Sequence, residues 1–180
     1  MAGLLRRALA SRLAADPGSL VIERGAHGKP YLGGAFRSGL AFNLSHSGDR
    51  LVIAIGKGRE LGVDVELIRP LESEALAERY FSKPESIVFR VTPPEKKEEA
   101  FFHYWTAKEA YLKAKGVGIG QGLKDHSFSD PWENPPRLTW AADPAETGLW
   151  RFHRFYPEGG YIGTLAYPGD LAKIREFSSL

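Results

Sequence analysis

Three carboxylates from two separate segments are the residues best suited to binding a cation. Asp64 and Glu66 lie two residues apart in the alternating segment 61–67, LGVDVEL, which predicts a strand with both acids on one face about 6–7 Å apart. Glu109 comes from a predicted helix over 98–115. Oxygen ligands suit a hard cation such as Mg²⁺, which commonly also binds substrate phosphates. The alternatives are a solvated strand face for the pair and an ordinary helix ion pair between Glu109 and Lys113, worth about 0.3–0.5 kcal/mol.

Basic and hydroxyl side chains elsewhere are suited to a phosphate. Lys29 lies in the rigid tripeptide Gly28-Lys29-Pro30, and Ser45-His46 ends a short apolar strand. The alternatives are a solvated loop lysine and a corner hydrogen bond. No Walker loop, dinucleotide fingerprint, zinc spacing or hydrolase triad is present. The residue patterns are therefore compatible with magnesium and a phosphorylated ligand, and they do not identify the reaction.

Both helices and strands must position these residues. The apolar run 51–55 and the turn 56–60 precede the acidic strand, and the predicted helix 98–115 ends at Gly116. Leu5, Leu9 and Leu13 predict an amphipathic helix rather than a targeting peptide. Further helices are predicted over 72–81 and from Ser82, where Glu85 completes a capping box. Other predicted strands are 19–23, 125–129, 137–140, 150–155 and 161–167. The segment 92–99 is predicted to be a mobile surface loop or the entry to a helix, and 116–122 a tight loop. The fold class is α+β.

Composition excludes several classes of protein. The 180 residues suffice for one domain or two small halves, and a formal charge of +2 does not argue for binding to nucleic acid or to a membrane surface. No apolar run is long enough to cross a membrane. The chain has no cysteine, which excludes disulfides and thiolate metal sites and favours a cytoplasmic location.

Four segments read together resemble the 4′-phosphopantetheinyl transferase superfamily, in its longer, Sfp-like form. They are Gly28-Lys29-Pro30-Tyr31, Phe42-Asn43-Leu44-Ser45-His46-Ser47, Gly62-Val63-Asp64-Val65-Glu66 and the run Trp105-Thr106-Ala107-Lys108-Glu109-Ala110-Tyr111-Leu112-Lys113. Each motif is modest alone, and the set in this order is specific.

The resemblance implies an enzyme that moves the phosphopantetheine arm of coenzyme A to a serine of an apo acyl or peptidyl carrier protein, releasing 3′,5′-ADP. By motif, the magnesium ligands would be Asp64, Glu66 and Glu109. The contacts with coenzyme A would be Lys29, Ser45 and His46 at its phosphates, with Lys108 and Lys113 at the pyrophosphate. Glu109 would also be the general base, and Lys113 would stabilise or protonate the leaving group.

The resemblance also implies two similar subdomains related by a pseudo-twofold, each a small antiparallel sheet packed with helices. Residues 1–60 would form the N-terminal half, and 61–180 the C-terminal half with the metal site and the motif helix. Longer members have a further segment before the one matching Leu4-Leu5-Arg6, so the N-terminal half is expected to be truncated. The protein is then expected to be a monomer or to self-associate through an exposed sheet edge.

Two other readings remain open. One is a non-catalytic homologue that binds coenzyme A or a carrier protein. The other is a magnesium-dependent nucleotide pyrophosphohydrolase, and retention of the acids and lysines favours the transferase over the non-catalytic homologue.

Overall fold

The computed structural model describes residues 2–37, 39–117 and 122–178. Its α-helices are α1 (Ala2–Leu13), α2 (Ser73–Tyr80), α3 (Lys83–Val91), α4 (Lys97–Lys115) and α5 (Glu146–Leu149). Short 3₁₀ turns cover Pro17–Ser19, Gly34–Phe36 and Pro94–Lys96. The strands are β1 (Ile22–Arg24), β2 (Pro30–Leu32), β3 (Ala41–Ser47), β4 (Arg50–Gly56), β5 (Gly62–Leu67), β6 (His126–Phe128), β7 (Leu138–Ala141), β8 (Trp150–Phe155) and β9 (Tyr161–Pro168).

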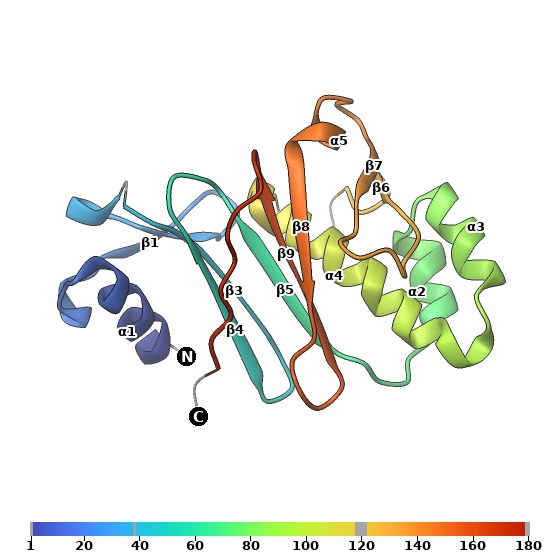
Figure 1. Cartoon of the computed structure of the whole chain (residues 1–180), viewed down its shortest axis with the longest axis horizontal. Coiled ribbons are helices and arrows are strands. Elements are labelled where there is room, and N and C mark those ends of the chain that lie inside the picture. The colour runs from blue at the N-terminus through green and yellow to red at the C-terminus, as the bar shows by residue number, and fades with distance from the viewer. Residues whose placement is uncertain (1, 38, 118–121, 179–180) are drawn as a thin grey trace.

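All of the hydrogen-bonded strand pairs are antiparallel, so the predicted α+β class is confirmed. β1 pairs with β2, β3 with β4, and β6 with β7, while β9 is the central strand of a three-stranded sheet in the order β5-β9-β8. In Figure 1, α1 and β1 lie at one end of the molecule, α2 and α3 lie at the other, and β3 and β4 lie between α1 and β5. The pseudo-twofold and the division at residue 60 stay predictions.

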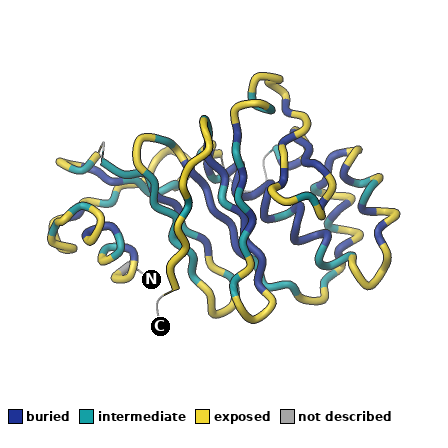
Figure 2. The backbone as a smooth tube through the Cα atoms, in the orientation of Figure 1, coloured by how far each residue is buried: buried dark blue, intermediate teal, exposed yellow. Residues whose placement is uncertain are grey.

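Helix α4 is the central element of the larger core. It packs against β5 and β9 on one side and against α2 and α3 on another, and most of its residues are buried (Figure 2). Gly116 ends the helix with a φ of 71°, and its N–H donates to the carbonyls of Leu112 and Lys113. Glycine adopts this left-handed conformation without strain, as the predicted C-cap required.

The N-terminal helix forms a second, smaller core. Leu5 and Leu9 of α1 are buried with Leu20, Leu32 and Phe42, so the predicted amphipathic helix is confirmed. Among the described residues, none of the helices combines the length and the apolarity that a membrane crossing requires.

One local prediction differs from the structure. The strand predicted over 19–23 begins later, at Ile22, because the Asp16 side chain accepts from the N–H of Gly18 and closes a 3₁₀ turn through Ser19. The segment 92–99, predicted as a surface loop or the entry to a helix, contains a 3₁₀ turn and the first residues of α4, so the helix entry is confirmed. The capping box of Ser82 and Glu85 is confirmed, and the predicted glycine loop lies partly outside the described residues.

Gly62 allows β5 to lie directly on α4, and it supplies the first prediction. A Cβ at this position would lie 2.2 Å from the carbonyl oxygen of Ala110 and 2.3 Å from the nitrogen of Ala114. Because both atoms belong to helix backbone, we expect Gly62→Ala to lower the free energy of unfolding by about 3 kcal/mol or more. Urea unfolding checks this value, with Gly148→Ala as the control, since a Cβ at Gly148 meets nothing within 4 Å. An unchanged denaturation midpoint for Gly62→Ala would contradict the close packing.

Candidate active site

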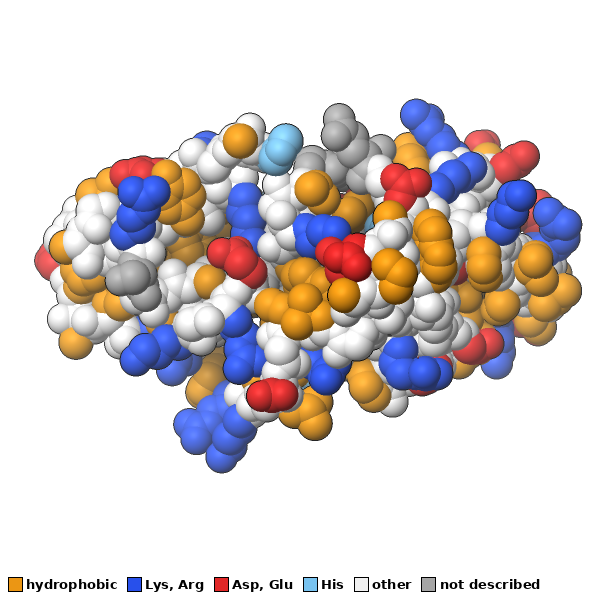
Figure 3. Space-filling model, turned by 90° about the horizontal axis from the view of Figure 1, so that it is seen from above, with side chains coloured by type: hydrophobic (Ala, Val, Ile, Leu, Met, Phe, Trp, Pro, Cys, Tyr) orange, Lys and Arg blue, Asp and Glu red, His pale blue; other side chains and the backbone are white. Residues whose placement is uncertain are grey.

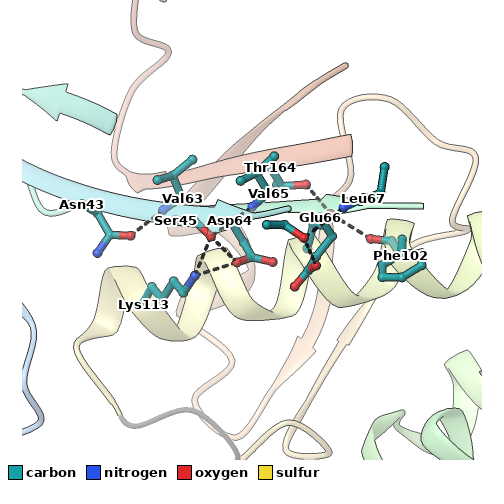
Figure 4. Close-up of polar contacts among 12 residues, drawn as sticks. Asn43, Ser45, Val63, Asp64, Val65, Glu66, Leu67, Phe102, Lys113 and Thr164 are labelled. Carbon is teal, nitrogen blue, oxygen red and sulfur yellow. Dashed lines mark hydrogen bonds and ion pairs between the residues drawn. The ribbon is translucent and has the colours of Figure 1, made fainter. Parts of the chain in front are cut away.

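The acidic face of β5 lies against α4 and not against solvent. Asp64 is 3% exposed and Glu66 is half-buried, while Val63 and Val65 on the opposite face are fully buried. In Figure 4 both carboxylates point from β5 toward the helix. This placement removes the simplest alternative, a strand with a wet face. Burial raises the pKa of both acids above the usual range, and the largest opposing effects are the Lys113 charge at Asp64 and the Ser47 hydrogen bond at Glu66.

Glu109 lies on the buried side of α4. Together with Asp64 and Glu66 it forms what we call the acidic group. Its side chain is 2% exposed, and neither of its carboxylate oxygens has a hydrogen-bond partner among the described residues. The pKa of Glu109 is raised to about 7, mainly by burial and also by the negative charges of Asp64 and Glu66, while the positive charge of Lys113 opposes the shift. The three predicted ligands therefore interact electrostatically across the contact between β5 and α4.

Lys113 neutralises part of this negative charge. Its Nζ lies 2.6 Å from Asp64 Oδ1 and 3.1 Å from Ser45 Oγ, as Figure 4 shows. The helix ion pair with Glu109, an alternative in the sequence, is not formed, since Glu109 has no partner and the ammonium is bonded to Asp64 instead. Lys113 thus connects the last turns of α4 to the acidic strand.

Hydroxyl groups of β3 hold the two acids of β5. Ser45 Oγ donates to Asp64 Oδ1 at 2.8 Å, and Ser47 Oγ donates to Glu66 Oε2 at 2.7 Å. Ser45 was predicted to contact a phosphate, and here its hydroxyl is buried and bonded to a carboxylate. Ser47 was not predicted as a site residue, although it shares a strand face with Ser45 in the alternation Asn43-x-Ser45-x-Ser47.

Lys108 lies apart from the acidic group, and its predicted contact with the pyrophosphate stays a prediction. Its side chain is fully buried, and its Nζ donates to both carboxylate oxygens of Glu85 and to the carbonyl oxygen of His126. Three acceptors satisfy all three ammonium protons. Lys108 therefore ties α4 to α3 and β6, and no donor is left for a ligand. Sequence reasoning identified Glu85 only as a capping residue and missed this partner.

Lys29 lies in a separate groove at the C-terminal end of α4. Its Nζ donates to Glu60 Oε2 at 2.7 Å and to the carbonyl oxygen of Ala114 at 2.8 Å, so it caps the helix with a positive charge. The groove has a volume of about 880 Å³, and Arg37, Arg59 and Lys115 also line it. Most of its charged side chains are basic, which suits a phosphorylated ligand.

His46 projects away from this acidic group. It is exposed and alternates along β3 with the buried Ser45, so the two side chains leave the strand on opposite faces. It stays a predicted phosphate contact. On the surface seen in Figure 3, basic and acidic side chains lie interspersed, without the single-sign field typical of proteins that bind nucleic acid.

The acidic group fits a hard cation by the chemistry of its donors. Asp64 Oδ2 and both oxygens of Glu109 are buried without a hydrogen-bond partner, and an unpaired buried carboxylate is strongly unfavourable unless a positive charge or a proton compensates it. Among the described residues, no three acidic or histidine side chains lie together in an arrangement that could hold a metal ion. Lys113 is bonded to Asp64 where a cation would compete with it.

The raised pKa of Glu109 supplies the second prediction. The Glu109 carboxyl has a pKa of about 7 in the folded chain and an ordinary pKa of 4.5 in the unfolded chain. Between these two pH values the folded chain keeps the proton and the unfolded chain loses it. The native state binds more protons there, so stability falls as pH rises through that window. We expect Glu109→Gln to be more stable than the metal-free wild type by about 2–3 kcal/mol at pH 8 and by little at pH 4.5. Urea unfolding at both pH values checks this, and a difference independent of pH would contradict it.

Comparison with known proteins adds a family relationship to this geometry. A family model described as the 4′-phosphopantetheinyl transferase superfamily matches residues 60–166. Among curated proteins, the 4′-phosphopantetheinyl transferase HetI of Nostoc sp. is 38% identical over 169 residues, which cover 93% of this chain and 68% of HetI. The 4′-phosphopantetheinyl transferase psf-1 of Bacillus pumilus is 38% identical over 67% of this chain and 50% of its own length. The solved holo-[acyl-carrier-protein] synthase of Thermotoga maritima matches with a TM-score of 0.45 and 25% identity, covering 61% of this chain and 62% of that one.

Proposed function

This chain belongs to the 4′-phosphopantetheinyl transferase superfamily, and we propose that it transfers the 4′-phosphopantetheine arm of coenzyme A to a serine of an apo carrier protein. The observation that carries the proposal is the buried acidic group inside the matched segment. There Asp64 Oδ2 and both Glu109 oxygens have no partner, and Lys113 lies beside them. The chain spans about two thirds of HetI and half of the Bacillus pumilus relative, so competence for the whole reaction is part of the proposal.

Asp64, Glu66 and Glu109 are the residues that would hold Mg²⁺. When bound, the ion neutralises charge on the pyrophosphate of coenzyme A as the phosphoryl group is transferred. The hydroxyl groups of Ser45 and Ser47 on β3 already orient the carboxylates of Asp64 and Glu66. The pKa of Glu109, raised to about 7, suits a group that takes up a proton near neutral pH.

The proposed transfer breaks one bond and forms one bond at phosphorus. The carrier serine oxygen attacks the phosphorus next to the pantetheine, and the bond from that phosphorus to the bridging pyrophosphate oxygen breaks. Glu109 accepts the serine proton, and 3′,5′-ADP leaves. Lys113 stabilises or protonates the leaving phosphate. Its ammonium is placed beside the proposed magnesium site, since it lies 2.6 Å from Asp64 Oδ1.

The groove at Lys29 is the proposed position of the coenzyme A phosphates. A phosphate there would compete with Glu60 for the Lys29 ammonium, and Arg37, Arg59 and Lys115 lie along the same groove. Ser45 and His46 stay proposed phosphate contacts, and the Ser45 hydroxyl also donates to Asp64 and accepts from Lys113. The absence of cysteine supports a proposed cytoplasmic location. A monomer, or self-association through an exposed sheet edge, stays a proposal.

The transfer is tested by mass spectrometry of an apo carrier incubated with this protein, Mg²⁺ and coenzyme A. We expect a gain equal to one phosphopantetheine that disappears with a chelator or with Asp64→Ala. No gain, with coenzyme A bound intact, would favour the non-catalytic homologue. Cleavage of coenzyme A in the absence of a carrier would favour the pyrophosphohydrolase.

A further inference from the structure

Strand β3 lies beside β5 through side chains and not through backbone hydrogen bonds. Three backbone N–H groups of β5 donate to alternate side chains of β3. The pairs are Val63 N to Asn43 Oδ1 at 2.9 Å, Val65 N to Ser45 Oγ at 3.3 Å and Leu67 N to Ser47 Oγ at 3.2 Å. Both strands advance by two residues from pair to pair, so they run parallel, and Figure 4 shows part of this row.

Two of these three side chains also hold an acid. Ser45 Oγ donates to Asp64 and Ser47 Oγ donates to Glu66, whereas the Asn43 amide oxygen accepts from Val63 alone. A hydroxyl has one proton to donate. Ser47 gives that proton to Glu66 and accepts from the Leu67 N–H, so its rotor is fixed from both sides.

Glu66 needs such a restraint more than Asp64 does. Its side chain is longer and only half-buried, whereas Asp64 is buried and also bonded to Lys113. With Oε2 bonded to Ser47, the orientation of the Glu66 carboxylate is set by a residue of β3. Residues behind metal ligands commonly act in this way, by fixing the orientation of the ligand.

We infer that Ser47 is a positioning residue for the cation site, which aims the Glu66 carboxylate from the neighbouring strand. The inference rests on the proposed cation site at Asp64, Glu66 and Glu109, and it assigns a role to a residue outside the predicted ligand set. If so, strand β3 in the N-terminal part of the chain sets the affinity with which the acids of the C-terminal part bind the cation.

The test is the Mg²⁺ dissociation constant of the full chain, measured by calorimetric titration at constant pH with coenzyme A present. We expect Ser47→Ala to weaken binding about tenfold or more, and Ser47→Thr, which keeps the hydroxyl, to restore it. Asn43→Ala is the matched control, because it removes the same kind of bond to β5 without touching an acid. It should lower the melting temperature and leave the dissociation constant within about twofold. Ser47→Cys, with a weak donor of similar size, should give an intermediate affinity and serves if Ser47→Ala does not fold.

Each outcome supports or overturns the inference. Equal Mg²⁺ affinity for Ser47→Ala, or for Ser47→Cys in its place, and the wild type would overturn it, as would equal losses for the serine and asparagine variants. In both cases a loss of binding in Asp64→Ala would leave the proposed function standing. If the wild type itself bound no Mg²⁺, the proposed cation site would fail and the inference with it.

Discussion

The Glu109→Gln variant is expected to transfer phosphopantetheine about 10³-fold more slowly than the wild type, while remaining folded. Glutamine keeps the size of the side chain but can neither accept the serine proton nor compensate a cation with negative charge. The effect is large because both proposed roles of Glu109 depend on the same buried carboxylate, whose oxygens have no hydrogen-bond partner in the part of the chain that the structure describes.

The measurement is the rate of carrier modification at saturating coenzyme A, with Glu98→Gln in the first turn of the same helix as the control. That control should retain the wild-type rate within about twofold, since it lies far from Glu109 along α4. Near-normal transfer by Glu109→Gln, with Mg²⁺ still bound, would contradict its assignment as the general base.

The Lys108→Met variant is expected to lose about 3–5 kcal/mol of folding free energy, because it leaves Glu85 as an uncompensated buried charge. Burial lowers the pKa of Lys108, while the adjacent Glu85 raises it, and the fully buried ammonium has no contact with solvent. The carboxylate of Glu85 additionally accepts from the backbone N–H groups of Ser82 and Phe128, so its charge is fixed in place.

Urea unfolding measures this loss, and Lys83→Met on the exposed surface of α3 is the control, expected within about 0.5 kcal/mol of the wild type. Lys113→Met distinguishes Lys113 from Lys108, since it should reduce the transfer rate more strongly than it reduces the free energy of unfolding. If Lys108→Met were as stable as Lys83→Met but could not transfer the arm, Lys108 would belong to the site after all.

The strand and the helix that carry the acids could be predicted from local patterns. Strict alternation over 61–67 corresponds to β5, and helical spacing with Gly116 at the end corresponds to α4. These patterns could not show which face of β5 would meet the helix. That depends on Gly62, which has no side chain to keep the helix away. Helix α4 can therefore cover the acidic face of β5, so that this face is buried and not exposed to solvent.

The roles of Lys108 and Ser47 could not be predicted, for a physical reason that they share. Both depend on partners distant in the sequence, Glu85 for the lysine and the acidic strand for the serine. Lys108 and Lys113 lie in the same motif, yet only Lys113 reaches the acidic group, because the two side chains leave α4 toward different neighbours. Membership of the family motif therefore did not decide which lysine faces the proposed site.

The most direct test of the proposed transfer is to quantify 3′,5′-ADP and modified carrier serine in the same reaction. The proposed mechanism predicts that they form in a one-to-one ratio, that both need Mg²⁺ and apo carrier, and that both are lost in Asp64→Ala. Release of 3′,5′-ADP without a modified serine, or formation of neither product by the folded wild-type chain, would contradict it.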